Sequence, residues 1–199
     1  MSTLKIAIIT GSTRPGRSGH AVARWVHELA QQRVDADYEL VDIADFNLPL
    51  FDEPMPPSRG DATKPHTKAW ARTIASHDGF VFVTPEYNHS ISGALKNALD
   101  FLSREWKDKA AGFVSYGGAG GARAVEHLRL ILSELQVATV RPQVLLSLFT
   151  DFQHFTTFAP LASRAGELAV TLDHVVAWAG AMRTLRAPRA VETPAVAAG

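Results

Sequence analysis

Glycines, hydroxyls and arginines gather in one short stretch near the start of the sequence. This stretch reads TGSTRPGRSG over residues 10–19 and follows an apolar run. Glycine lets a backbone approach a ligand closely, and a helix start offers free N–H groups and the positive end of the helix dipole. Hydroxyl and charge-assisted donors come from Ser12, Arg14, Arg17 and Ser18. The combination predicts a binding site for a phosphate group.

Two other interpretations of this stretch stay open. It nearly matches the phosphate loop of nucleotide hydrolases, but Arg17 stands where that pattern requires lysine. No apolar strand ends in an aspartate placed to support magnesium, because residues 81–83 run into Thr84, Pro85 and Glu86. The stretch would also fit a plain turn with a serine N-cap and two solvated arginines.

A second polar segment, TPEYNHSISG, covers residues 84–93 and again follows an apolar run. A planar, mostly apolar ring needs a flat wall and donors for its polar edge. Tyr87 offers the aromatic surface, and Asn88 and Ser90 can reach ring heteroatoms. The alternative is a polar turn in which Ser90 or Ser92 caps the following helix.

A third segment, SYGGAGGA over residues 115–122, is rich in glycine and precedes a helical pattern. It is not a dinucleotide fingerprint, because Arg123 occupies the place of the third glycine. We expect its backbone to approach a flat ring closely, with a flexible connector as the alternative.

Five apolar segments alternate with helical patterns along the chain, which predicts a doubly wound parallel sheet. Several of these segments are continuously apolar, as expected for strands that helices cover on both faces. Ligands of such sheets bind outside the carboxyl ends of the strands, so the three segments above should share one rim. The expected strands are Leu4–Thr10, Tyr38–Ile43, Gly79–Thr84, Ala111–Tyr116 and Thr139–Val140 with its flanks.

GSTRPGRS (11–18), PEYNHSISGALKNALDFL (85–102) and VSYGGAGG (114–121) together resemble the NADPH-dependent FMN reductase family. That family includes bacterial flavin, quinone, azo-dye and chromate reductases, and the resemblance covers roughly residues 4–140. It implies a flavodoxin-like α/β fold over residues 1–186, with five parallel strands in the order 2-1-3-4-5 and helices on both faces. It also implies a homodimer or homotetramer.

The resemblance assigns roles to particular residues. The FMN phosphate would lie against Ser12, Arg14, Arg17, Ser18, Gly19 and His20. The isoalloxazine ring would lie along Pro85, Glu86, Tyr87, Asn88 and Ser90, with its far edge at Ser115, Tyr116, Gly117 and Gly118. One departure is Ser92, where family members often have proline, and we expect a looser start to the following helix.

The implied activity is a flavoprotein oxidoreductase in which NADPH, or NADH, gives a hydride to flavin N5. A small acceptor, such as free flavin or a quinone, then takes the electrons. No protein acid or base is required, so no catalytic residue is named. Arg17, or a residue of the proline-rich segment 47–65, would help to bind the nicotinamide cofactor's phosphate. A flavodoxin-type electron carrier and a non-catalytic flavin-binding module are the alternatives.

Composition excludes several other classes. Cysteine is absent, so disulfides, thiolate metal sites and cysteine nucleophiles are ruled out, and the histidines show no metal-binding spacing. Lys+Arg and Asp+Glu each number 20, so the neutral chain gives no electrostatic reason to expect nucleic acid or membrane as partner. The apolar run at residues 6–9 is too short for a membrane span and lacks signal-peptide flanks, which predicts a cytoplasmic protein. Residues 187–199 are expected to form a disordered tail.

Overall fold

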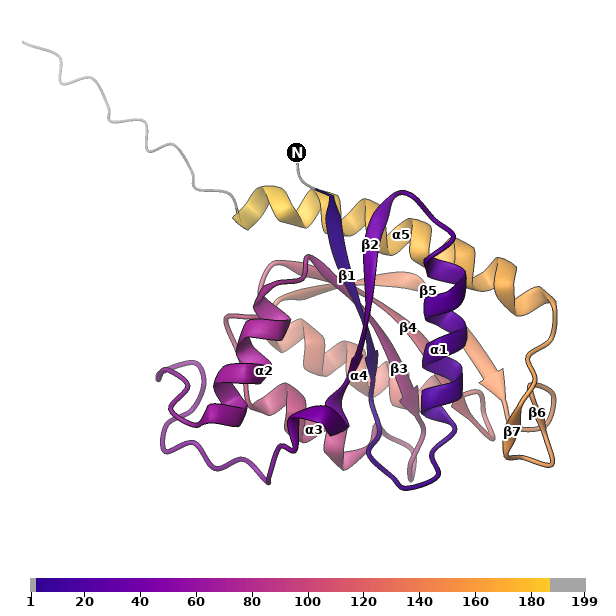
Figure 1. Ribbon diagram of the computed structural model, residues 1–199, viewed down its shortest axis with the longest axis horizontal. Coiled ribbons are helices and arrows are strands. Elements are labelled where there is room, and N and C mark those ends of the chain that lie inside the picture. Colours follow the sequence, from indigo (N-terminus) through magenta and orange to yellow (C-terminus); the bar gives the residue numbers. More distant parts are fainter. Residues whose placement is uncertain (1–2, 187–199) are drawn as a thin grey trace, which may run out of the picture.

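Five parallel strands form the centre of the molecule, in the order β2-β1-β3-β4-β5 (Figure 1). The computed structural model describes residues 3–186, so the predicted tail at 187–199 lies outside the described residues. The strands are β1 (Leu4–Thr10), β2 (Ala36–Asp42), β3 (Gly79–Pro85), β4 (Lys109–Gly117) and β5 (Val137–Ser147). The predicted flavodoxin-like order is confirmed.

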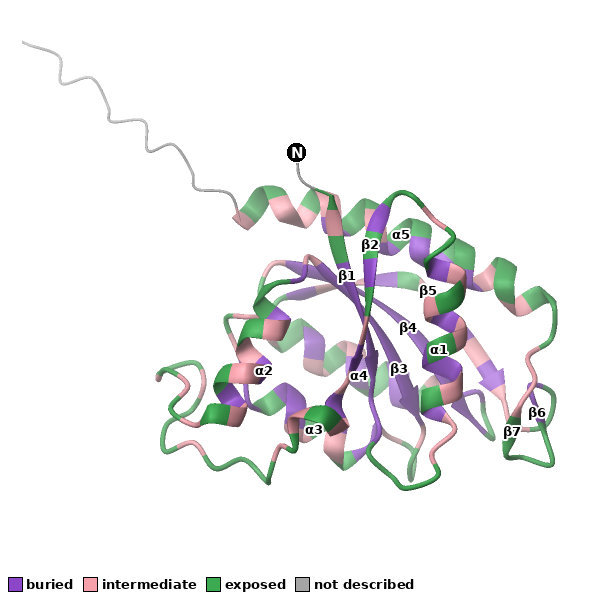
Figure 2. Cartoon of the chain, viewed as in Figure 1, coloured by how far each residue is buried: buried purple, intermediate pink, exposed green. Residues whose placement is uncertain are grey.

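Each central strand is apolar on both faces because both faces are covered. In β3, Phe80 and Phe82 enter one hydrophobic core, and Val81 and Val83 enter the other. All four side chains are fully buried, and Figure 2 shows the same for most of β3 and β4. The period of two follows from the pleat of a strand, so an unbroken apolar run fits a sheet with helices on both sides.

Helices α2 (Pro65–Ala75), α3 (Gly93–Asp100) and α4 (Ala122–Glu134) pack against one face of the sheet. Helices α1 (Gly19–Ala30) and α5 (Ser163–Arg186) pack against the other. Trp70 of α2 and Trp106 are fully buried in the core on the first of these faces, and the indole N–H of Trp70 donates to the carbonyl of Ala98 in α3 at 2.8 Å. The helical patterns that alternate with the apolar segments of the sequence therefore correspond to helices of the structure.

Three elements depart from the sequence-based expectations. A 3-10 helix, η1 (Ile43–Phe46), follows β2 directly. Strand β5 continues to Ser147, well past Val140, because its edge position tolerates polar residues such as Arg141. A small antiparallel hairpin, β6 (Phe152–Gln153) and β7 (Thr157–Phe158), then stands between β5 and α5.

Lys109 is a buried cation at the start of β4. Its ammonium donates to the carbonyl of Ile74 at 2.6 Å and to that of Ala75 at 3.3 Å, where α2 ends. Burial, together with the nearby charge of Arg186, lowers the pKa of Lys109 to about 8. The unfolded chain keeps the proton to a higher pH, so between these two pKa values it binds more protons than the folded protein. Stability therefore gains from Lys109 as the pH rises through this window.

The variant Lys109→Met should lose this pH dependence. Relative to the variant, the parent's free energy of unfolding should increase by about 1 kcal/mol per pH unit between roughly pH 8 and pH 10. Urea unfolding across this range measures the difference, with the exposed Lys68→Met as the control. Parallel pH profiles for Lys109→Met and the parent would show that Lys109 titrates normally.

Candidate functional site

Three loops meet at the carboxyl edge of the sheet, at the lower side of Figure 1. Loop 1 is residues 11–18, loop 3 is residues 86–92 and loop 4 is residues 118–121. The amide of Gly11 donates to the carbonyl of Val83 at 2.8 Å, and the amide of Glu86 donates to that of Tyr116 at 3.0 Å. The sheet thus aligns the three predicted segments on one rim.

Loops 1 and 3 share polar contacts across the rim. The hydroxyls of Ser12 and Tyr87 are 3.2 Å apart, and Arg14 Nε donates to the Tyr87 hydroxyl at 3.3 Å. Ser12 is buried, whereas Arg14 and Tyr87 are exposed at the surface. The side chains of Ser12 and Arg14 therefore meet Tyr87 across the rim, and the two segments are neighbours, as expected from the sequence.

Tyr87 is held by a tight turn. Its amide donates to the carbonyl of Ser90 at 2.9 Å, and the amide of Ser90 donates back to that of Tyr87 at 3.1 Å. Asn88 and His89 between them have φ of 48° and 73°, as a type I′ turn requires. Ser90 Oγ also lies 3.0 Å from the imidazole Nδ1 of His127 on α4. The turn fixes the tyrosine ring at the rim and leaves Asn88 exposed at its tip.

Loop 4 is compact and depends on glycine. Gly120 and Gly121 have φ of +66° and +77°, a region that other residues rarely adopt. The buried Ser115 hydroxyl donates to the carbonyl of Gly120 at 2.8 Å. A methyl group placed on Gly117 would lie 3.2 Å from the Cβ of Glu86, so loop 3 packs closely against the end of β4, where loop 4 begins.

Unpartnered donors surround the start of α1. Among the described residues, four buried side-chain polar atoms lack a hydrogen-bond partner, and three of them are Thr10 Oγ1, Arg17 Nε and the Tyr116 hydroxyl. A Cβ on Gly19 would lie 2.7 Å from the Tyr116 hydroxyl and 3.6 Å from Thr10 Cγ2, so both of these side chains lie against Gly19, two residues after Arg17. Ser18, the helix N-cap, makes no side-chain cap. Donors without acceptors at a helix start suit an anion.

Asp42 is a residue of this region that sequence reasoning missed. Its carboxylate pairs with Arg17, accepts the amide of Ala44 at 3.0 Å and lies 3.8 Å from Nδ1 of the exposed His20. Asp42 thereby orients the guanidinium and leaves Arg17 Nε unpartnered. Its position in the sequence could have indicated this role. Asp42 ends β2 and pairs in register with Thr10, the residue that ends β1 just before loop 1.

Several predicted site residues have side chains that bond to other residues of the protein or are buried. The Glu86 carboxylate pairs with the Arg123 guanidinium and also accepts the Arg123 amide at 3.2 Å, which anchors the start of α4. Ser115 holds loop 4, and the Ser18 hydroxyl donates to the carbonyl of Thr156 at 3.3 Å. Pro85 is buried at the end of β3. The structure brings these residues to the rim, but their side chains shape the loops.

Ser92 does not loosen the start of α3. It is the N-cap of the helix, and its hydroxyl accepts the amide of Leu95 at 3.1 Å and donates to the carbonyl of Gly11 at 2.6 Å. One side chain therefore caps the helix and ties it to loop 1, so the looser start expected at this position is wrong.

The variant Ser92→Ala should lower the free energy of unfolding by about 2 kcal/mol, since it removes a cap and leaves a buried carbonyl unpaired. Chemical denaturation measures the change, and the exposed Ser58→Ala is the matched control. Equal free energies of unfolding for Ser92→Ala and Ser58→Ala would show that the hydrogen bonds of Ser92 do not stabilise the fold.

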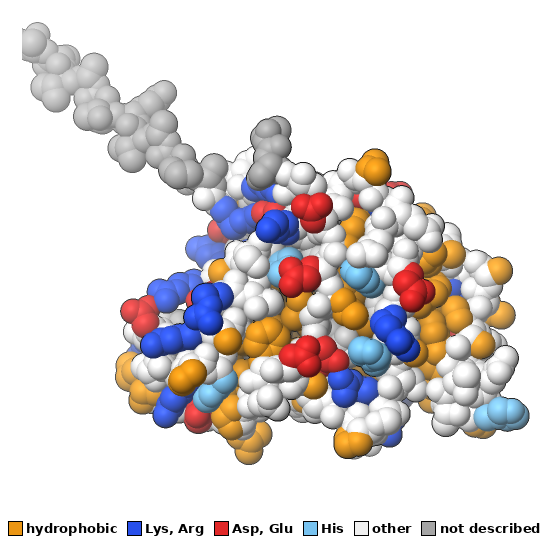
Figure 3. Space-filling view, in the orientation of Figure 1, with side chains coloured by type: hydrophobic (Ala, Val, Ile, Leu, Met, Phe, Trp, Pro, Cys, Tyr) orange, Lys and Arg blue, Asp and Glu red, His pale blue; other side chains and the backbone are white. Residues whose placement is uncertain are grey.

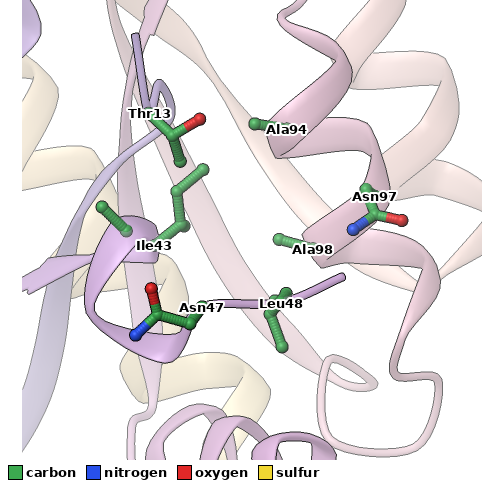
Figure 4. A pocket seen from close by; sticks show the side chains of 8 residues that line it. Thr13, Ile43, Asn47, Leu48, Ala94, Asn97 and Ala98 are labelled. Carbon is green, nitrogen blue, oxygen red and sulfur yellow. The ribbon is translucent and has the colours of Figure 1, made fainter. Parts of the chain in front are cut away.

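A cavity of about 400 Å³ lies beside loop 1, between η1 and α3 (Figure 4). Thr13 is the loop 1 residue that lines it, together with Ile43, Ala44, Asn47, Leu48, Ala94, Asn97 and Ala98. Both polar groups of the Asn97 side chain are already bonded to the backbone, at Pro49 and Phe51. This cavity adjoins the rim but lies apart from the unpartnered donors.

The surface shows no single-sign field on the face seen in Figure 3, where basic and acidic side chains are interspersed. Over residues 3–186, no helix combines the length and apolarity that crossing a membrane requires. The same part of the chain contains no group of three or more His, Asp or Glu side chains suited to a metal ion.

Comparison with known proteins gives consistent matches. The family model for NADPH-dependent FMN reductase matches residues 4–151. An NAD(P)H-dependent FMN reductase of Nectria sp is 43% identical over 148 residues, which are 71% of this chain and 74% of that protein. A probable NADPH:quinone oxidoreductase of Oryza sativa subsp. japonica is 37% identical over 149 residues, 72% of this chain and 71% of that protein.

Among solved structures, FerB, a flavoenzyme NAD(P)H:(acceptor) oxidoreductase from Paracoccus denitrificans, matches with a TM-score of 0.72. The match covers 90% of this chain and 98% of FerB at 22% sequence identity. At that identity the likeness shows the fold alone, and it agrees with the five-stranded order described above.

Proposed function

Because this chain belongs to the NADPH-dependent FMN reductase family and is therefore an NAD(P)H-dependent flavin oxidoreductase, we propose that loops 1, 3 and 4 hold its FMN. The phosphate lies at the start of α1, and the isoalloxazine ring lies between Tyr87 and Gly117–Gly118. The single observation that carries this placement is the group of unpartnered donors beside Gly19.

Chemistry and position both support the phosphate end. Arg17 Nε and the hydroxyls of Thr10 and Tyr116 can each donate to a phosphate oxygen, and the orphan N–H groups of the first helical turn add to them. Asp42 fixes the guanidinium beforehand, so little side-chain entropy is lost on binding. Arg14 is exposed in the same loop, so its positive charge adds to the attraction for an anion.

The ring end is supported by the shape of loops 3 and 4. Tyr87 supplies an exposed aromatic surface, and its tight turn presents it rigidly. Gly118 is exposed without a side chain, so a flat ring can approach its backbone. Glu86 keeps loop 4 against loop 3 by pairing with Arg123, and it acts as a positioning residue.

The overall reaction is NAD(P)H plus a proton plus a quinone giving NAD(P)⁺ and a hydroquinone, with free flavin as the other acceptor class. When bound, FMN would supply the two-electron redox chemistry that links NAD(P)H to the acceptor. The protein's residues bind the cofactor, orient its ring and leave one face of the ring open to the nicotinamide and the acceptor. Backbone amides of loop 4 and the hydroxyl of Tyr87 would stabilise negative charge at the ring edges.

Anaerobic spectroscopy tests this function. The protein with added FMN should show a bound-flavin spectrum that bleaches on addition of NAD(P)H and returns with a quinone. Either alternative, a flavodoxin-type carrier or a non-catalytic module, would bind FMN and leave NAD(P)H unoxidised. A protein that binds no FMN would contradict the proposal altogether.

We further propose a homodimer or homotetramer that acts in the cytoplasm, where reduced nicotinamide cofactors are available. The exposed apolar residues Leu50 and Met55 in segment 47–65 favour a subunit contact there. Analytical ultracentrifugation gives the assembly state, and cell fractionation gives the compartment. A monomer at micromolar concentration, or a protein in the membrane fraction, would contradict these two points.

A further inference from the structure

Two phenylalanines stand exposed at the carboxyl edge of the sheet, outside loops 1, 3 and 4. Phe149 is 69% exposed and Phe155 is 59% exposed. Their rings meet edge to face, with centroids 5.5 Å apart and an interplanar angle of 90°. Single exposed apolar residues are ordinary on protein surfaces, but a paired and oriented set invites a functional explanation.

The hairpin β6–β7 that carries Phe155 is firmly anchored. Phe152 packs on Tyr116 with ring centroids 6.0 Å apart, and Phe158 packs on Trp25 at 5.6 Å. These inward-facing rings provide the apolar packing of the hairpin, so Phe155 at its tip adds nothing to that core. The exposed pair is therefore not explained by folding of the hairpin.

The segment is also fixed at both ends. Asp151 is fully buried, and it accepts bonds from the amides of Ser147 and Leu161 and from the Arg164 guanidinium. Burial acts to raise the pKa of Asp151, but the hydrogen bonds from Arg164, from the two backbone amides and from Thr150 together hold it below its usual range. The carbonyl of Thr156 accepts the Ser18 hydroxyl, which ties the hairpin to loop 1.

Backbone strain at Phe155 also indicates that this exposed side chain has a role other than folding of the hairpin. His154 and Phe155 have φ of 50° and 61°, which are the conformations that glycine or asparagine usually supply at such a turn. A bulky residue there is a genuine outlier. The chain thus keeps a large aromatic side chain where a small one would fit the backbone better, and such strain persists most often at ligand sites.

The pair adjoins the proposed ring site. The Cε2 atom of Phe149 lies 4.0 Å from the position that a Cβ on Gly118 would occupy. Residues 147–162 contain no lysine or arginine, so this side of the rim has no free cation of its own to attract the phosphates of a nicotinamide dinucleotide. An uncharged aromatic ligand suits these surroundings better.

We propose that Phe149 and Phe155 contact the electron acceptor and select a planar, uncharged aromatic molecule such as a naphthoquinone. This inference rests on the proposed function, because the acceptor must reach the flavin held beside Gly118. Phe149 follows the end of β5 and lies beside Gly118, and Phe155 in the turn of the hairpin packs edge to face against Phe149. Phe155 lies beyond residues 4–151, the part that the family model matches.

The test compares acceptors that need a stacking surface with one that does not. Steady-state kcat/KM is measured with 2-methyl-1,4-naphthoquinone and with ferricyanide, for the parent and for the double variant Phe149→Ala/Phe155→Ala. The naphthoquinone-to-ferricyanide ratio should fall about tenfold, as expected for the loss of two aromatic contacts. The exposed Trp178→Ala on α5 is the matched control and should keep the parent ratio.

A second variant separates contact from structure. Phe155→Asn suits the left-handed backbone, so its melting temperature should equal or exceed that of the parent while the ratio still falls. An unchanged naphthoquinone-to-ferricyanide ratio in both variants would overturn the proposal. An altered sedimentation coefficient of the variants would also overturn it, because it would assign Phe149 and Phe155 to a subunit contact. If the parent oxidises no NAD(P)H with either acceptor, the proposed function itself fails. This result differs from an unchanged ratio in an active enzyme, which contradicts only the role of the two phenylalanines.

Discussion

Replacing Arg17 with methionine should weaken FMN binding about 50-fold while riboflavin binding changes little. Arg17 Nε is buried without a partner, and Nη2 of the same guanidinium pairs with Asp42. A charge-assisted hydrogen bond contributes about 1.5–3 kcal/mol, and methionine keeps the length of the side chain but donates nothing. Riboflavin lacks the phosphate, so it gains nothing from Arg17 in the parent.

Quenching of flavin fluorescence gives both dissociation constants. Arg24→Met, an exposed arginine on α1, is the matched control and should bind FMN like the parent. Asp42→Asn should show an intermediate loss, because Arg17 stays in place but is no longer oriented by a charge. An equal loss of FMN and riboflavin affinity in Arg17→Met would mean that Arg17 supports the loop and not the phosphate.

Gly121→Ala should lower the free energy of unfolding by about 3 kcal/mol or more. The new Cβ would lie 2.6 Å from the Cβ of Ser115 and 2.8 Å from the amide nitrogen of Tyr116, and neither can move freely. The residue also has φ of +77°, where alanine is strained. Relief of the clash must displace loop 4, so FMN affinity should fall together with stability.

Gly118→Ala is the comparison within the same loop. Gly118 is exposed, and the nearest atom to its added Cβ is Phe149 Cε2 at 4.0 Å, so stability should stay within about 0.5 kcal/mol of the parent. Chemical denaturation with and without FMN measures both variants. If Gly121→Ala were as stable as Gly118→Ala, the tight packing of loop 4 would be contradicted.

The central fold was predictable because its signals are local and strong. Unbroken apolar runs such as residues 79–83 can only be buried on both faces, and helical spacing between them leaves few topologies. The order of the strands came from the family resemblance, and the structure and the family match agree with it. The rim that joins Ser12, Arg14 and Tyr87 followed from the same reasoning.

The unpredicted features depend on contacts between distant residues. The pairing of Arg17 with Asp42 requires the alignment of β1 and β2, and the role of Glu86 requires Arg123 at the start of another helix. Hairpin β6–β7 was missed because its strands have two residues each and its turn holds histidine and phenylalanine in place of the usual asparagine and glycine.

A crystal structure of the protein with FMN tests the proposed site most directly. We expect the phosphate within hydrogen-bond distance of Arg17 Nε and the Tyr116 hydroxyl, and the isoalloxazine ring between Tyr87 and Gly117–Gly118. Flavin bound instead in the cavity beside Asn47 and Asn97, with the donors around Gly19 still unpartnered, would contradict the placement.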